Sequence, residues 1–239
     1  MIRRHSPAGI FMHWFNAACW LILSATGLGL IDNPALQPLG MWWVELWRAL
    51  GFDGKALLAV HAATGLVWAA VWAVFCLTRW RRETGPFLGR TFRFSPLGDA
   101  VWLRRKVLLL AAGEKFMRAR GLDTSLPEQG FYNAGQKAFA VLVVCCGLGL
   151  AVTGAAALVS RLWAGGQAAV QWSLAVHFLC AVLTAVGLPV HVYMAALAPG
   201  EGPALRSMFT GFVPREYVRH HNPLWFRQLS GERGPTPPE

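Results

Sequence analysis

The sequence predicts an all-α integral membrane protein, a four-helix bundle with both termini in the cytoplasm. Three observations support this fold class: the composition, four long apolar stretches, and the uneven placement of Lys and Arg. The chain has 239 residues, of which 55% are hydrophobic and 14% are charged, whereas a soluble domain carries about 25% charged residues. Its twelve Trp residues fit aromatic belts at membrane interfaces.

Four stretches are long enough to cross a bilayer, which needs about 20 apolar residues of helix. They cover about residues 10–31, 56–78, 138–160 and 168–197. Backbone groups cannot stay unpaired in lipid, and no alternating barrel pattern is present, so we expect helices. The first stretch follows Arg3 and Arg4, as in a signal peptide. Because its 22 residues can span a membrane, we expect an uncleaved first helix.

The orientation follows from the loops. Two basic residues precede the first stretch, twelve lie in 79–137 and five follow residue 198. These three regions share one side of a four-helix bundle and hold nineteen basic residues, against three on the other side. The excess predicts that both termini and the middle loop are cytoplasmic.

The connecting segments complete the expected organisation. Residues 41–47 are typical of a short interfacial helix. Residues 100–120 are too short and too charged to span, so we expect them on the cytoplasmic surface. Residues 1–228 would form a single membrane domain, followed by a disordered tail at 229–239.

Charge and cysteine content exclude other classes. The net charge of +10 would suit nucleic-acid binding, but no helix offers a basic recognition face, so we expect no nucleic-acid partner. The five cysteines lie in apolar stretches, without the spacing of c-type haem, zinc or iron–sulfur sites. They are interpreted as small packing residues.

Four of the seven histidines lie inside the predicted spans: His13, His61, His177 and His191. Ionisable residues are costly in a membrane and usually functional. His177 and His191 are 14 residues apart, which is about 21 Å along a helix and about 40° short of four full turns. They therefore leave one helix on nearly the same face, one near each membrane surface.

The direction of each helix sets the depth of its histidine. Depth allows one pairing, with His61 and His177 on the outer side and His13 and His191 on the inner side. Histidines facing each other from different helices are axial ligands for haem iron, so we expect two b-type haems about 20 Å apart. Two axial histidines leave no open coordination position, which favours electron transfer over oxygen chemistry. Gly27 and Gly65 would provide room for a flat macrocycle or simply for close helix packing.

Polar residues precede the third span. Asn133 and Gln136 share a helix face, level with the inner histidine pair, and their amides suit the carbonyl oxygens of a quinone. Asn133 as a plain helix N-cap is the alternative. A transporter or proton channel would need acidic groups in the spans, and none is present. A purely structural anchor would leave four matched histidines unexplained.

Several pieces of the chain resemble one family over about residues 10–228: Met12-His13-Trp14, Val60-His61 with Gly65, the run Tyr132–Lys137, His177, the stretch His191–Ala195, and His220–Arg227. They are similar to the gamma, cytochrome b, subunit of membrane-bound respiratory formate dehydrogenases. The run Tyr132–Lys137 and the fourteen-residue histidine spacing are the most specific of these features.

The resemblance implies a non-catalytic electron-transfer subunit in the bacterial inner membrane. It implies an outer iron–sulfur beta subunit, a molybdenum or tungsten catalytic alpha subunit, and menaquinone or another quinone reduced at the cytoplasmic side. The implied haem ligands are His13, His61, His177 and His191, and the implied quinone contacts are Asn133, Gln136 and His191. The middle loop and the first outer loop look longer than is usual in the family. Related cytochrome b subunits of hydrogenases and thiosulfate-type reductases are the alternatives.

Overall fold

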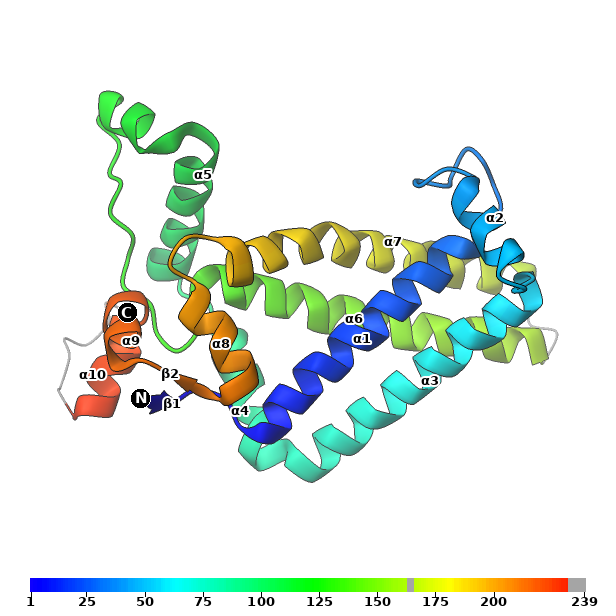
Figure 1. Cartoon of the computed structure of the whole chain (residues 1–239), viewed down its shortest axis with the longest axis horizontal. Coiled ribbons are helices and arrows are strands. Elements are labelled where there is room, and N and C mark those ends of the chain that lie inside the picture. Colours follow the sequence, from blue (N-terminus) through cyan, green and yellow to red (C-terminus); the bar gives the residue numbers. More distant parts are fainter. Residues whose placement is uncertain (163–165, 232–239) are drawn as a thin grey trace. The chain divides into compact units, whose positions relative to one another are not determined.

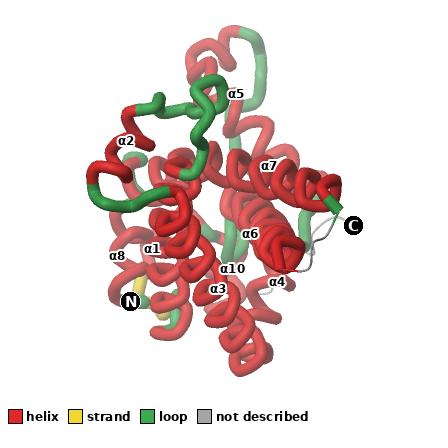
Figure 2. Tube along the Cα trace, turned by 90° about the vertical axis from the view of Figure 1, so that its right-hand side faces the viewer, coloured by secondary structure: helices red, strands yellow, loops and turns green. Residues whose placement is uncertain are grey.

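The computed structural model describes residues 1–162 and 166–231 and confirms the all-α fold. In the described part, helices form nearly all the regular structure, and the only strands are β1 (Ile2–Arg3) and β2 (Phe212–Val213) (Figures 1 and 2). Four helical segments there are long and apolar enough to cross a membrane: Pro7–Gly29, Gly54–Thr91, Ala134–Ser160 and Gln167–Leu197. Large apolar side chains remain exposed along them, as lipid-facing helices require. The chain is a multi-pass membrane protein.

The α-helices of the described residues are α1 (Pro7–Gly29), α2 (Trp42–Ala49), α3 (Gly54–Arg79), α4 (Gly85–Thr91), α5 (Val101–Ala119), α6 (Ala134–Leu162), α7 (Gln167–Val192), α8 (Gly202–Thr210), α9 (Arg215–His221) and α10 (Pro223–Ser230). Wider π-helical turns lie at Trp80–Thr84, Pro96–Ala100 and Tyr193–Leu197. The first of these turns joins α3 to α4, and the third extends α7.

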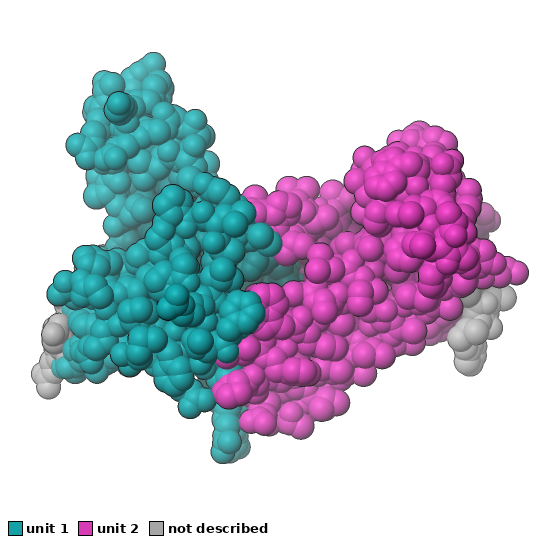
Figure 3. Space-filling view, in the orientation of Figure 1, with its two compact units in different colours: residues 1–6, 81–143, 191–239 teal, residues 7–80, 144–190 magenta. Residues whose placement is uncertain are grey.

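The chain divides into two compact units (Figure 3). Unit 1 comprises residues 1–6, 81–143 and 191–239, and unit 2 comprises residues 7–80 and 144–190. Helices α6 and α7 contribute residues to both units. Unit 1 therefore brings together the N-terminal, middle and C-terminal segments of the chain. These are the three regions predicted to share one membrane side.

Unit 2 holds the helix contacts that build the bundle. A Cβ at Gly147 of α6 would lie 3.3 Å from the Trp68 ring of α3, and one at Gly149 of α6 would lie 2.8 Å from Cys180 Sγ of α7. Glycine at these positions therefore lets neighbouring helices approach closely. Asn16 of α1 accepts hydrogen bonds from the indole nitrogens of Trp68 and Trp72, so its amide oxygen is paired within the bundle.

Helix α2 packs against the end of α1 in the same unit. Trp43 Nε1 donates to the carbonyl of Ala25 at 3.0 Å, and Trp43 and Trp47 form an edge-to-face pair. The expected short helix at 41–47 is confirmed, with bounds of Trp42–Ala49.

Unit 1 has a small core of Val213, Val218 and Trp225. Beside it, β1 pairs antiparallel with β2. The buried Arg4 donates to Asn222 Oδ1 and to the Phe131 carbonyl, both at 3.0 Å. Its guanidinium also lies 5.1 Å from the centre of the Phe131 ring. One buried cation thus connects the N-terminus, the end of the middle segment and the C-terminal tail, with each contact charge-assisted or aromatic.

Element boundaries differ from the predicted ones in several places. The second span was expected to end at residue 78, but helical structure continues through a π-helical turn to Thr91. The helix continues because charged residues end an apolar stretch without ending a helix. Pro86 does not interrupt it, since proline is tolerated in the first turn of a helix, here α4. The surface segment at 100–120 forms α5, which is interrupted at Gly113, where φ is +80°. Leu229 and Ser230 of the expected tail belong to α10, and residues 232–239 of that tail lie outside the described residues.

Candidate functional site

His61 of α3 and His177 of α7 lie side by side in unit 2. Their ring centroids are 6.2 Å apart, and the ring planes are inclined by 65°. Both side chains are half-buried. The structure therefore brings together the two histidines that the depth argument pairs on the outer side.

A threonine holds each of these rings through the same nitrogen. Thr26 Oγ1 lies 2.9 Å from His61 Nδ1, and Thr153 Oγ1 lies 3.0 Å from His177 Nδ1. Each hydroxyl also donates to a carbonyl one turn earlier on its own helix, at Ile22 for Thr26 (2.7 Å) and at Gly149 for Thr153 (2.6 Å).

The hydrogen-bond network assigns a tautomer to both rings. A hydroxyl has one proton to donate, and here it goes to the carbonyl, so the threonine oxygen accepts from the Nδ1–H of the histidine. The ring nitrogen that carries no proton is then Nε2, which is the form that binds a metal ion.

A glycine follows each threonine and faces the same ring. A Cβ at Gly27 would lie 3.3 Å from His61 Cε1, and a Cβ at Gly154 would lie 3.4 Å from His177 Cε1. Each imidazole therefore packs its Nδ1–Cε1 edge against a Thr-Gly pair of a neighbouring helix. This leaves its Nε2 edge for a ligand.

The spacing of the two rings fits axial ligation of one iron. Metal–imidazole bonds of about 2 Å, plus about 1 Å from nitrogen to ring centre, place two axial ligands about 6 Å apart. The observed 6.2 Å matches this value. Among the described residues no group of three or more His, Cys, Asp or Glu could hold a bare metal ion. Two imidazoles alone suit a metal that brings its own equatorial nitrogens, as haem does.

The inner pair is distributed over both units. His13 belongs to α1 in unit 2, and His191 is the first residue of α7 that belongs to unit 1. The His191 ring stacks on Phe139 of α6 with centroids 4.4 Å apart and planes inclined by 6°. The pairing of His13 with His191 stays a prediction.

Asn133 and Gln136 form a reciprocal cap at the start of α6. Asn133 Oδ1 accepts from the Gln136 N–H at 2.9 Å, and Gln136 Oε1 accepts from the Asn133 N–H at 3.1 Å. This capping box confirms the N-cap role of Asn133. Because both amide oxygens face backbone donors, both NH2 groups point elsewhere and can donate. Their contact with a quinone stays a prediction.

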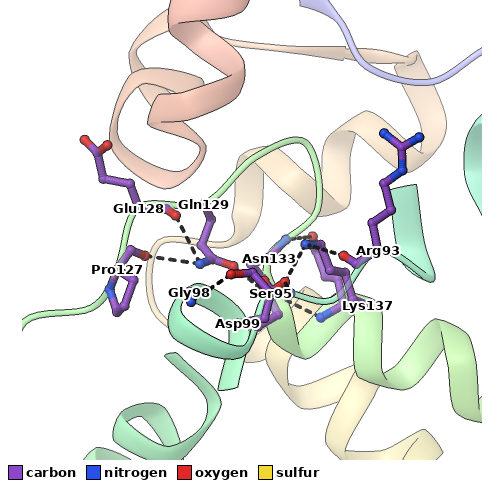
Figure 4. A network of polar contacts seen from close by, with 11 residues as sticks. Arg93, Ser95, Gly98, Asp99, Pro127, Glu128, Gln129, Asn133 and Lys137 are labelled. Atoms are coloured by element: carbon purple, nitrogen blue, oxygen red, sulfur yellow. Dashed lines mark hydrogen bonds and ion pairs between the residues drawn. The ribbon is translucent and has the colours of Figure 1, made fainter. Parts of the chain in front are cut away.

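Neighbouring polar groups hold this helix start in place (Figure 4). Lys137 Nζ donates to Asp99 Oδ2 at 2.8 Å, and Asp99 is 3% exposed. Asp99 also accepts from the Ser95 N–H, and Gln129 Oε1 accepts from the Ala134 N–H. Asp99 and Gln129 were not expected from sequence, since nothing local marks them as partners of this turn.

Thr26 and Thr153 were also missed. Each is followed by glycine inside an apolar span, but Thr-Gly occurs in the second span as well, at Thr64-Gly65, so this pattern alone does not single them out. Of the tail histidines, His220 lies 2.7 Å from Glu216 and is exposed, as expected for a surface role.

Comparison with known proteins points to the same chemistry. The family model of prokaryotic cytochrome b561 matches residues 4–211. The chain is 23% identical to the formate dehydrogenase cytochrome b556(fdo) subunit of Escherichia coli K12, over 96% of this chain and 93% of that protein. It is 27% identical to the nitrate-inducible formate dehydrogenase cytochrome b556(Fdn) subunits of Escherichia coli K12 and Shigella flexneri, over 91% of this chain and 86% of those proteins. A b-type haem follows from the family, and the chain belongs to the prokaryotic cytochrome b561 family.

Proposed function

We propose that this chain is the di-haem membrane subunit of a formate dehydrogenase-like complex and carries electrons from an iron–sulfur subunit to a quinone. The facing pair of His61 and His177 carries this proposal, because each ring has its Nδ1 occupied and its Nε2 available. Similar proteins named as formate dehydrogenase cytochrome subunits support the choice of complex.

The residues of the chain would bind and orient the two haems. His61 and His177 would hold one haem from opposite sides, and His13 and His191 would hold the other. When bound, each haem iron supplies one-electron transfer. With a histidine on each side, the chain would keep oxygen and water from the iron.

The proposed partners follow the proposed orientation. An iron–sulfur beta subunit, with a molybdenum or tungsten alpha subunit, would approach the outer side of a bacterial inner membrane, near α2. The side with nineteen basic residues would face the cytoplasm. The gathering of the N-terminal, middle and C-terminal segments in unit 1 supports their placement on one side.

The quinone site would combine Asn133, Gln136 and His191. Phe139 lies one turn beyond Gln136 on α6 and stacks on His191, so these groups occupy adjacent turns of unit 1. The free amide NH2 groups would donate to a quinone oxygen, which needs hydrogen-bond donors. A helix mouth at the water interface would also supply protons.

The haem proposal is tested with the purified full-length protein. Two haems per chain are expected from pyridine-haemochrome quantitation, with two components in the reduced-minus-oxidised spectrum. His61→Ala and His177→Ala should remove the same component, and His13→Ala and His191→Ala should remove the other. Loss of one component in both His13→Ala and His61→Ala would contradict the pairing, and His220→Ala is the control at an exposed histidine.

The quinone proposal needs variants that separate capping from binding. Asn133→Asp with Gln136→Glu keeps both cap oxygens and removes both NH2 donors, and acidic groups suit a helix N-terminus. Both haems should remain and be reduced normally, while reoxidation by a quinone analogue slows. Asn33→Asp makes the same change at an exposed turn and should have no effect. Normal reoxidation in the double variant would place the quinone elsewhere.

A further inference from the structure

The two threonines that contact the facing histidines share one arrangement on different helices. Thr26 lies on α1 and meets His61 of α3, while Thr153 lies on α6 and meets His177 of α7. In both cases the next residue is a glycine whose missing side chain makes room for the same ring. The recurrence on two helix pairs indicates a requirement of the histidines rather than a local accident of packing.

Threonines in membrane helices also bond their own helix without any functional purpose. Thr184 of α7 gives the comparison within this chain: it is 3% exposed and donates to the Cys180 carbonyl at 2.9 Å. No histidine contact of Thr184 is found among the described residues. The bond to the helix carbonyl is therefore sufficient for a buried threonine, and the histidine contact of Thr26 and Thr153 is additional.

That additional contact has an electronic consequence. A histidine that donates its Nδ1–H to an acceptor is a more basic ligand through Nε2. A more basic axial ligand stabilises the ferric state of iron relative to the ferrous state. Hydrogen bonds to the ligands are among the means by which a protein sets the reduction potential of haem.

We infer that Thr26 and Thr153 are positioning residues that fix the tautomer of His61 and His177 and lower the reduction potential of the haem these histidines hold. The inference rests on the proposed function for the presence of that haem. It goes further in assigning two hydroxyl groups, one for each ligand, to the control of the potential.

The test is an equilibrium redox titration of the purified, haem-loaded full-length protein, followed by absorbance. Thr26→Val and Thr153→Val keep the shape of the side chain and remove the hydroxyl acceptor, which leaves the backbone of Leu23 and Leu150 as the remaining partners of the two rings. Each variant should raise the reduction potential of the haem proposed to be held by His61 and His177. That haem is identified as the spectral component that is lost in His61→Ala. If one bond favours the ferric state tenfold, the shift is about 59 mV for a one-electron couple. In the double variant the reduction potential should shift by the sum of the two single-variant shifts, because each threonine acts through its own histidine.

Matched variants distinguish the hydroxyl from packing. Thr26→Ser and Thr153→Ser retain the acceptor and should keep the potential near that of the unaltered protein. Thr184→Val removes a buried hydroxyl that meets no histidine and should leave both haems unchanged. The reduction potential of the other haem, which is identified as the spectral component lost in His13→Ala, should stay constant in all of these threonine variants.

The possible outcomes separate this inference from the proposed function. Unchanged potentials in both valine variants with haem retained would overturn the inference and leave the function standing. Serine variants that behave like the valine variants would also overturn it. If the valine variants lose this haem while the serine variants keep it, the positioning role is supported. Absence of haem from the unaltered protein would instead refute the proposed function.

Discussion

At the scale of single residues, several polar groups inside the apolar helices are paired with partners on neighbouring helices. Asn16 receives two indole donors, and Thr26 and Thr153 each meet an imidazole. An unpaired polar group costs several kcal/mol in hydrocarbon. The same pairs therefore stabilise the bundle and orient the candidate ligands.

Gly27 gives a prediction at this scale. In Gly27→Ala the new Cβ would lie 3.3 Å from His61 Cε1, so the ring must shift by a few tenths of an ångström. We expect lower haem content or an altered spectrum of the component that depends on His61. Gly147→Ala is the matched control, because its Cβ would lie equally close, 3.3 Å, to the Trp68 ring and meets no histidine. An effect of equal size in both variants would show that general helix packing, and not the histidine, is disturbed.

At the scale of elements, the C-terminal helices are held to the middle segment of unit 1 by polar contacts. Arg227 of α10 forms an ion pair and hydrogen bonds with Glu128, which lies before α6. The Leu224 N–H donates to the Gln129 carbonyl, and Asn222 Nδ2 donates to the Gly130 carbonyl. These contacts fix the segment that leads into the capping box of α6.

The Arg227–Glu128 pair should make the attachment of α10 depend on pH. The hydrogen bond from Arg227 lowers the pKa of Glu128, so the pair stabilises above the usual glutamate range and is lost as pH falls through the lowered pKa. At pH 7, Glu128→Gln should reduce hydrogen-exchange protection of residues 223–230. The reduction should be at most about fivefold, because exposed ion pairs contribute about 0.2–1 kcal/mol.

As pH falls through the lowered pKa of Glu128, the difference between Glu128→Gln and the unaltered protein should disappear, since Glu128 becomes protonated. Glu114→Gln is the matched control, because Glu114 pairs with Arg118 on its own helix α5. A difference that persists at low pH would show that the carboxylate charge does not hold α10.

At the scale of the whole molecule, the candidate sites divide between the two compact units. The segments that gather in unit 1 contain Asn133, Gln136 and His191, while unit 2 contains the His61–His177 pair. A donor on the outer side and a quinone on the inner side would move each electron across the membrane. That movement is worth about 2.3 kcal/mol per charge for each 100 mV.

Turnover of the complex in sealed vesicles should therefore generate a membrane potential. The measurement uses a potential-sensitive dye, with formate as donor and a quinone as acceptor. An uncoupler should abolish the dye signal and leave electron transfer intact. Turnover without a potential would mean that donor and quinone act on the same side, and that the proposed orientation is wrong.

The local sequence was sufficient for the spans, the short α2 helix, the N-cap at Asn133 and the proximity of His61 and His177. The spans, the short helix and the cap depend on quantities that one segment carries by itself, whereas the proximity of the two histidines also needs the direction of each helix. Apolar length sets the spans, the helical rise sets the depth of each histidine, and residue type sets the cap. Helix α3 and its continuation to Thr91 exceeded the prediction because apolarity reports where lipid ends and not where a helix ends.

Only the tertiary structure decided which hydrogen-bond partners the polar groups find. Thr26 with His61, Asp99 with Lys137, and Arg4 with Asn222 are separated by 35, 38 and 218 residues. The sequence by itself determined that such groups need partners, because unpaired polar groups are costly away from water. Which partner each one finds depends on how neighbouring helices are rotated and packed, and no local pattern carries that information.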